Sequence, residues 1–359
     1  MTDTLNRASA PIDFGRPGWV WRRRGVSARI DRRSVIVSLL LVAVIVIGGL
    51  VTLGVGTLSL TPGEVLAALF DPNAPDKHRL VVSTWRLPRL LFAVLCGAAL
   101  AISGAIFQSL TKNPLGSPDV IGFSAGSYTG AVVVMLFVGS TSYSTIAVGS
   151  LIGGAVTAGL VYGLAVRGGL QAFRLIIVGI GVSALLGSLN SLLLLSVSPE
   201  QAMLASVWGA GTLSGLGFGQ LGPAFLGFLI LLVGAAMVGR PLGQLELGDD
   251  RARSLGTRAE GGRIWAIVIG VALTALVTAA AGPISFVALA APQIARRLTR
   301  SASVQFVPVA LTGAALLVLA DLVALNVALP VGVVTVSIGG AYLAWLLVSE
   351  YRSRGRTAS

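Results

Sequence analysis

Cysteine, histidine, lysine and charge in general are scarce in this 359-residue chain. The single cysteine, Cys96, excludes an intrachain disulfide, and the single histidine, His78, excludes a zinc site of familiar spacing. Charged residues make up 11% of the chain, against about 25% in a typical soluble domain. So little charge cannot coat a water-facing globule or supply the positioned titratable groups that catalysis needs. We therefore expect neither a soluble protein nor an enzyme.

The chain also lacks the signature of an ATP-binding phosphate loop. That loop requires Gly-Lys followed by Ser or Thr. The only two lysines, Lys77 and Lys112, instead follow Asp76 and Thr111. We expect no cofactor on this chain, and if ATP powers its activity, a separate subunit must bind the ATP and its Mg²⁺.

Long apolar runs are abundant. Hydrophobic residues make up 55% of the sequence, and the mean hydropathy is +0.88. The clearest run, Ser34 to Gly56, carries no charge, and about 20 apolar residues in a helix cross a bilayer. Because it is too long for the core of a signal peptide, we interpret it as a retained first span. Ten spans are predicted, at about residues 35–56, 90–110, 119–138, 145–166, 174–196, 219–239, 264–282, 284–298, 306–326 and 330–348.

These runs predict an all-α polytopic membrane protein with about ten transmembrane helices. Residues 1–34 form a basic cytoplasmic arm, residues 35–350 form the transmembrane domain, and residues 351–359 form a cytoplasmic tail. We expect one long apolar region to break in two around Gly282-Pro283.

The basic residues orient the chain. Its formal net charge is +12, and residues 1–34 carry eight arginines. Because Lys and Arg hold loops on the cytoplasmic side, we place both termini inside and expect a membrane rather than a nucleic acid as the partner of this charge. With ten spans, all but four of the 26 Lys and Arg then lie in cytoplasmic segments. The exceptions belong to the first external loop: Lys77, Arg79, Arg86 and Arg89.

Charge inside the spans is rare. Asp321 is the clear case, either near the external interface or paired with a residue of another helix. Ion-coupled carriers usually place several ionisable groups inside their spans. The sequence therefore disfavours a stand-alone secondary carrier or a channel.

Two apolar segments resemble each other. Gly97-Ala98-Ala99-Leu100 precedes Pro114 and Gly116, and Gly313-Ala314-Ala315-Leu316 precedes Pro330 and Gly332 at the same offsets. The two copies would cross the membrane in opposite directions, as inverted repeats of transporters do. A chance match in a sequence rich in Ala, Gly and Leu explains the similarity equally well.

Two polar loops indicate partners. In the first, Pro88 begins a helix and sets Arg86 and Arg89 close together, facing outward. They can bind carboxylates of a partner or extend to lipid phosphates. In the second, at about residues 240–263, Asp249 and Asp250 precede Arg253 and predict a short helix that ends at Gly256. Such a helix is typical of a docking site for a cytoplasmic partner.

The order of several motifs resembles the FecCD family of permease subunits, which serve ABC importers of iron-siderophores, haem and vitamin B12. The resemblance covers about residues 58–348. The motifs are Arg86-Leu87-Pro88-Arg89, Gly97 to Gly104, Gln108, Asn113-Pro114-Leu115, Leu247-Gly248-Asp249, Ala252, Leu255-Gly256, Gly282 to Val287, Pro292, Arg296, Ala320-Asp321 and Leu329 to Thr335.

The resemblance implies a type II ABC importer permease fold in the bacterial cytoplasmic membrane. A second permease subunit, two ATP-binding subunits and an extracytoplasmic substrate-binding protein complete such an importer. Arg86 and Arg89 are then the residues that dock the binding protein. The loop that couples the permease to the ATPase falls on residues 245–256, with these residues as candidates: Leu245, Leu247, Gly248, Asp249, Ala252, Arg253, Leu255 and Gly256.

Three positions depart from the family pattern. Gln293 stands where the family often has His, Leu325 where it commonly has Arg, and Ala328 where it often has an acidic residue. Two identical subunits would both lack the external arginine, so a heterodimer with a different permease is favoured over a homodimer. A ferric siderophore is the favoured substrate because iron systems dominate the family, with vitamin B12 and haem as alternatives.

Overall fold

The computed structural model describes residues 18–23, 26–140, 142–165, 172–301, 303–342 and 344. A two-stranded antiparallel hairpin, β1 (Gly18–Arg23) and β2 (Val26–Asp31), precedes the helices. Two π-helical segments, Leu80–Arg86 and Val134–Val138, continue α3 into α4 and extend α5. The α-helices are α1 (Arg32–Gly54), α2 (Pro62–Phe70), α3 (Asp76–Arg79), α4 (Leu87–Thr111), α5 (Phe123–Val133), α6 (Tyr143–Ala165), α7 (Ala172–Leu195), α8 (Pro199–Gly209), α9 (Phe218–Glu246), α10 (Asp249–Ser254), α11 (Ala259–Ala281), α12 (Val287–Thr299), α13 (Phe306–Val327) and a further helix at Val331–Tyr342.

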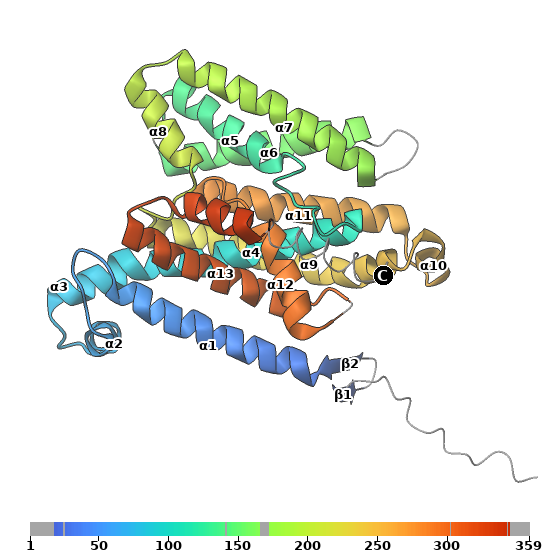
Figure 1. Cartoon of the computed structure of the whole chain (residues 1–359), viewed down its shortest axis with the longest axis horizontal. Helices are drawn as coiled ribbons and strands as arrows, with labels where there is room; N and C mark the ends of the chain where they lie inside the picture. The colour runs from blue at the N-terminus through green and yellow to red at the C-terminus, as the bar shows by residue number, and fades with distance from the viewer. Residues whose placement is uncertain are drawn as a thin grey trace, which may run out of the picture.

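The helices pack in two groups (Figure 1). Helices α5 to α8 form one group, while α9, α11, α12 and α13 surround α4 in the other, with α1 packed along α13. Contacts of α6 and α5 with α11 join the groups. Short elements mark the two ends of the bundle. We call them the α3 end, where α2 and α3 lie, and the α10 end (Figure 1).

Glycine lets α4 approach its neighbours closely. A Cβ atom on Gly97 would overlap the carbonyl oxygen of Gly313 in α13, and one on Gly313 would overlap that of Gly97. A Cβ atom on Gly104 would likewise overlap the carbonyl oxygen of Ala288 in α12. The two similar sequence segments therefore pack against each other through their glycines. This is the close backbone contact that stabilises helix pairs within a membrane.

Each of the ten predicted spans coincides with a helix. Seven helices of the described residues are long and apolar enough to cross a membrane, and Phe123–Val138 and Val331–Tyr342 are shorter apolar helices. The tenth, α12, has 13 residues and is only about 20 Å long, short of the roughly 30 Å hydrocarbon core. The last predicted residues, 345–348, lie outside the described part, as do residues 1–17 of the arm and the whole tail 351–359.

The predicted break at Gly282-Pro283 separates α11 from α12. Gly282 has a φ of +73°, which glycine adopts without strain. A Cβ atom there would overlap the carbonyl oxygen of Trp208. The chain then stays irregular up to Phe286, so part of the predicted span 284–298 is lost from the helix.

The hairpin, α2, α3 and α8 were not predicted as structured. The hairpin lies in the arm, for which no secondary structure was predicted. Helix α2 begins with a capping box, in which Thr61 and Glu64 each bind the other's backbone N–H. Helix α8 is capped by Ser198, whose side chain accepts a hydrogen bond from the backbone N–H of Gln201. These local signals span only a few residues each and produce no long apolar run.

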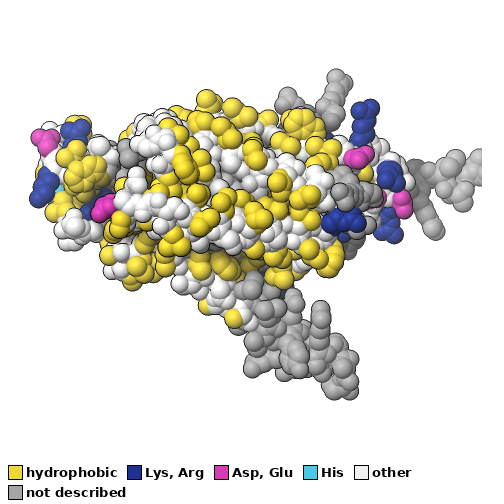
Figure 2. Space-filling view, turned by 90° about the horizontal axis from the view of Figure 1, so that it is seen from above, with side chains coloured by type: hydrophobic (Ala, Val, Ile, Leu, Met, Phe, Trp, Pro, Cys, Tyr) yellow, Lys and Arg dark blue, Asp and Glu magenta, His cyan; other side chains and the backbone are white. Residues whose placement is uncertain are grey.

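Hydrophobic side chains cover the middle of the molecule, and charged side chains gather at its two ends (Figure 2). Leu39 of α1, Ile177 of α7 and Ile230 of α9 are among the exposed apolar residues. Cys96, in contrast, is fully buried in α4, as expected for a small apolar residue. An apolar band between two polar ends is the surface of a multi-pass membrane protein.

Candidate functional site

At the α3 end, Arg86 closes the turn between α1 and α2. Its guanidinium group donates hydrogen bonds to the carbonyl oxygens of Leu53, at 2.7 Å, and Leu58, at 2.6 Å. Gly56, between these two residues, has a φ of +145°, and a Cβ atom there would lie 2.7 Å from an Arg86 nitrogen. Carbonyl oxygens carry no formal charge, so these two partners hold Arg86 in place without neutralising its positive charge.

Arg89, one helical turn further, forms an ion pair with Asp321 of α13. Its Nε lies 3.0 Å from Asp321 Oδ2, and its Nη2 lies 2.9 Å from Oδ1, so the pair is bidentate. The third nitrogen, Nη1, donates to Ser214 Oγ at 3.0 Å. The side chains are 18% exposed for Arg89 and 1% for Asp321. Of the two interpretations left open for Asp321, the structure establishes the pairing across helices.

Both arginines therefore bind groups of their own chain. We expected their guanidinium groups to face outward, and the structure differs because carbonyl groups at the end of α1 and a buried carboxylate in α13 are nearer partners. An Arg-x-x-Arg spacing cannot reveal these partners, since Leu53 and Asp321 lie far from it in the sequence. The docking role of Arg86 and Arg89 is not tested by this geometry and stays a prediction.

At the α10 end, the predicted short helix is present. Helix α10 runs from Asp249 to Ser254, with Asp249 and Asp250 in its first turn. Gly248 before it and Gly256 after it have φ values of +105° and +81°. Gly256 N–H donates to Arg253 O at 2.9 Å, which ends the helix as predicted.

Helix α10 is fixed to the helices on both sides of it. Ala252 is buried in a small apolar cluster with Leu245 of α9 and Ala259 of α11. Asp249 forms an ion pair with Arg263 of α11, and Thr257 donates a hydrogen bond to Gln244 of α9. A force applied to α10 would therefore reach both α9 and α11.

The loop exposes two apolar side chains next to charged ones. Leu247 is 55% exposed and Leu255 is 58% exposed, on either side of α10. Arg253 also faces outward, in an exposed ion pair with Asp250 at 3.5 Å. Of the eight candidate residues, the structure thus separates internal anchors, Leu245, Asp249 and Ala252, from outward side chains, Leu247, Arg253 and Leu255. Gly248 and Gly256 shape the backbone.

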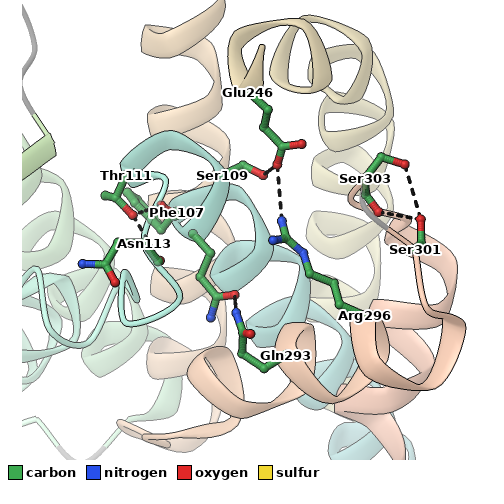
Figure 3. A network of polar contacts seen from close by, with 10 residues as sticks. Phe107, Ser109, Thr111, Asn113, Glu246, Gln293, Arg296, Ser301 and Ser303 are labelled. Carbon is green, nitrogen blue, oxygen red and sulfur yellow. Dashed lines mark hydrogen bonds and ion pairs between the residues drawn. The ribbon is translucent and has the colours of Figure 1, made fainter. Parts of the chain in front are cut away.

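A polar network lies next to α10 (Figure 3). Glu246, the last residue of α9, accepts a hydrogen bond from Ser109 Oγ of α4. The same carboxylate oxygen, Oε1, lies 3.3 Å from Arg296 Nη2 of α12. One carboxylate thus joins three helices, two residues before Gly248.

A second contact ties α12 to α4. Gln293 Nε2 donates to Gln108 Oε1 at 2.6 Å, and Gln108 Nε2 donates to Leu289 O at 2.9 Å. Gln108 and Gln293 line a pocket of about 390 Å³. The pocket is lined by Gln108, Ser109, Lys112, Asn113, Pro114, Glu246, Gln293 and Arg296.

Glu246 was missed as a site residue by the sequence analysis. Gln293 entered only as a departure from the family pattern, although its amide makes the contact with Gln108. The available signal was the position of Glu246 directly before Leu247-Gly248-Asp249, but no spacing relates it to Arg296, 50 residues later.

The protein-family comparison matches the FecCD transport family over residues 40–349. The ferric enterobactin transport system permease protein FepG of Escherichia coli is 47% identical over 329 residues, which cover 90% of this chain and 99% of that protein. The Fe(3+) dicitrate transport system permease protein FecD of Escherichia coli is 36% identical, covering 86% and 98%. The iron(3+)-hydroxamate import system permease protein FhuG of Bacillus subtilis is 34% identical, covering 88% and 97%.

A solved structure has the same fold. It is described as an inward-facing conformation of a putative metal-chelate type ABC transporter, and it superposes with a TM-score of 0.76 at 27% identity. The superposition covers 88% of this chain and 99% of the other. With a match of nearly full length to the family and to several of its members, this chain belongs to the FecCD transport family of membrane permeases.

Proposed function

We propose that this chain is a permease subunit of an ABC importer that carries a ferric siderophore across the bacterial cytoplasmic membrane. The observation that supports this most strongly is the near full-length similarity to a ferric enterobactin permease. The relatives named for ferric dicitrate and iron-hydroxamate point to the same class of substrate, a bulky iron chelate.

A proton- or sodium-driven carrier is a weaker alternative. Asp321, a carboxylate buried within a spanning helix, has its charge neutralised by Arg89 in a bidentate pair. A group that binds a coupling ion must release its partner during transport, and the four contacts of Arg89 oppose such a release. Importers of vitamin B12 or haem remain alternatives within the family.

The energy source in this proposal is ATP with Mg²⁺, bound by two separate subunits that dock at the α10 end. The exposed side chains of Leu247 and Leu255 are suited to this contact, because apolar side chains near the centre of an interface supply much of its binding energy. The anchoring of α10 to α9 and α11 would carry the motion of the ATPase into the bundle.

The Glu246 network offers a path for that motion to α12. A shift of the α9 terminus would move Glu246, and its contacts with Arg296 and Ser109 would act on α12 and α4. The pocket is lined by residues at the ends of α4, α9 and α12, and three of them, Ser109, Glu246 and Arg296, converge in Figure 3. We propose that its opening forms part of the exit on the α10 side.

The substrate-binding protein would dock at the α3 end. Here Arg86 and Arg89 have different electrostatic roles. Within the described part of the chain Arg86 binds neutral carbonyl groups and forms no ion pair, whereas the charge of Arg89 is balanced by Asp321. An acidic partner surface would therefore respond to Arg86 more strongly than to Arg89.

The second permease subunit completes the translocation path. A heterodimer is supported by Leu325 and Ala328, since a different permease could supply the missing charged contacts. The positive-inside distribution supports cytoplasmic termini for the arm 1–34 and the tail 351–359. Recovery of tagged and untagged copies of this chain in one active complex would contradict the heterodimer.

The test is uptake by the reconstituted complex in proteoliposomes. Labelled ferric enterobactin, ferric dicitrate, haem and cobalamin are supplied with the binding protein, with and without ATP inside. We expect ATP-dependent uptake of a ferric siderophore. Uptake of haem or cobalamin instead would overturn the substrate, and uptake driven by a proton gradient without the ATPase would overturn the importer.

A further inference from the structure

A groove with charged and apolar walls opens between the start of α1 and the end of α12. Its volume is about 720 Å³. Three arginines, Arg32, Arg33 and Arg300, stand among its lining residues, and Ile36, Leu40 and Leu298 supply apolar walls. We propose that this groove binds an anionic phospholipid, with the headgroup at the arginines and an acyl chain along α1.

The position of the groove matches the polar–apolar boundary of a bilayer. Arg32 and Arg33 are the first residues of α1, and the helix continues into a run of apolar residues that are largely exposed, such as Leu39 and Leu40. The arginines therefore lie at headgroup depth when the apolar part of α1 lies in hydrocarbon. The distribution of basic residues predicts the leaflet on this side to be the cytoplasmic one.

One arginine is held in place across the groove. Arg33 Nε donates a hydrogen bond to Leu298 O at 2.7 Å, which joins α1 to α12. Among the described residues this bond uses only Nε of Arg33, so both Nη groups are open to a ligand. Asp31 also lines the groove, but its carboxylate caps α1 by accepting from the Arg33 backbone N–H at 3.1 Å. The three arginines outnumber this single acidic group, so the rim favours an anion.

The apolar walls distinguish a lipid from a soluble phosphate. A small phosphate would contact only the rim and leave Ile36, Leu40 and Leu298 without a partner. A phospholipid places a phosphate and an acyl chain on one molecule, as the groove places arginines and leucines side by side. Basic pockets between helices on this side of membrane proteins are typical sites for such headgroups.

The experiment measures lipid retention by the purified complex that contains the full chain. Native mass spectrometry compares phosphatidylglycerol with phosphatidylcholine of identical acyl chains, added in equal amounts. The main variant combines Arg32→Gln and Arg300→Gln, which leaves the bond from Arg33 to Leu298 intact. Each basic residue near an anionic headgroup contributes about 1 kcal/mol, or roughly fivefold in affinity. We therefore expect the variant to lose roughly 30-fold in affinity for phosphatidylglycerol.

A matched control removes two exposed arginines of the same end that do not line the groove, Arg240→Gln with Arg258→Gln, and should retain the lipid preference. The single variant Arg33→Lys keeps the positive charge and should retain most of the binding of phosphatidylglycerol. Equal retention of both lipids by the unmodified protein would overturn the proposal. So would an unchanged preference in the main variant, or displacement of the lipid by glycerol phosphate at equal concentration, which would indicate a soluble ligand.

Discussion

The α3 end and the α10 end both carry charged residues, but these residues make different contacts. At the α3 end, the two arginines of Arg-Leu-Pro-Arg bind groups inside their own chain, one of them a buried carboxylate. At the α10 end, the ion pair of Asp249 with Arg263 fixes a short helix that lies between two exposed leucines, Leu247 and Leu255. Charge therefore stabilises the fold at one end and positions a candidate contact surface at the other.

The largest difference between the ends concerns stability. Asp321→Asn leaves Arg89 partly buried without its counter-charge, and removing one partner of a buried pair costs about 3–5 kcal/mol. We expect a strong fall in the denaturation midpoint of the purified protein. Asp250→Asn, in the exposed pair with Arg253, should leave the midpoint unchanged.

A double variant refines this prediction. Arg89→Met with Asp321→Leu removes both charges, and such replacements of a buried pair are often neutral. Its midpoint should return toward that of the unmodified protein. If Asp321→Asn alone were as stable as the unmodified protein, the structural role assigned to the α3 end would be wrong.

The second prediction tests the two exposed leucines of the α10 end, Leu247 and Leu255. Leu247→Glu with Leu255→Glu places two charges where the ATPase is proposed to dock. We expect at least tenfold lower ATP-dependent uptake and loss of the ATPase subunit on purification, since charge in an apolar contact is costly. Phe70→Glu, an exposed apolar residue of α2 at the opposite end, is the matched control and should retain the ATPase.

A smaller effect on uptake is expected from changing Glu246, which connects the end of α9 with α4 and α12. Glu246→Gln weakens the contact with Arg296 but leaves ATPase docking intact, so uptake should fall several-fold while ATP hydrolysis continues. The reversed pair, Glu246→Arg with Arg296→Glu, should restore part of the uptake that Glu246→Arg alone removes. Equal losses of hydrolysis and uptake in Glu246→Gln would argue against a role in transmission.

The smallest effect concerns docking at the α3 end. Arg86→Glu should lower the affinity of the substrate-binding protein for the permease a few-fold. The loss should depend on salt concentration, because charges at the rim of an interface act mainly on the association rate. Arg89→Gln should affect stability more than docking. Surface plasmon resonance at low and high salt separates the two variants, with Arg240→Glu at the other end as control. If Arg86→Glu lowered the affinity equally at low and high salt, Arg86 would serve only to hold the loop between α1 and α2.

Much of the fold follows from the sequence because a bilayer imposes a simple rule. An apolar run of sufficient length forms a helix, since no water satisfies its backbone groups. The short elements were harder to predict from the sequence. The hairpin, α2 and α8 are too short to produce a hydropathy signal, although α2 carries a capping box in Thr61 and Glu64. In the irregular stretch before α12, Gly282 packs closely against the carbonyl oxygen of Trp208, a residue remote from it in the chain.

At the candidate sites, the local part was predicted and the distant part was not. The sequence by itself determined α10, because Asp249, Asp250 and Gly256 act within one or two helical turns. Only the tertiary structure decided that Arg89 binds Asp321, that Glu246 meets Arg296, and that Gly97 packs on Gly313. The physical reason is that helix starts and stops depend on neighbours in the chain, whereas these contacts depend on which helices lie side by side, and similar apolar helices can pack in many arrangements.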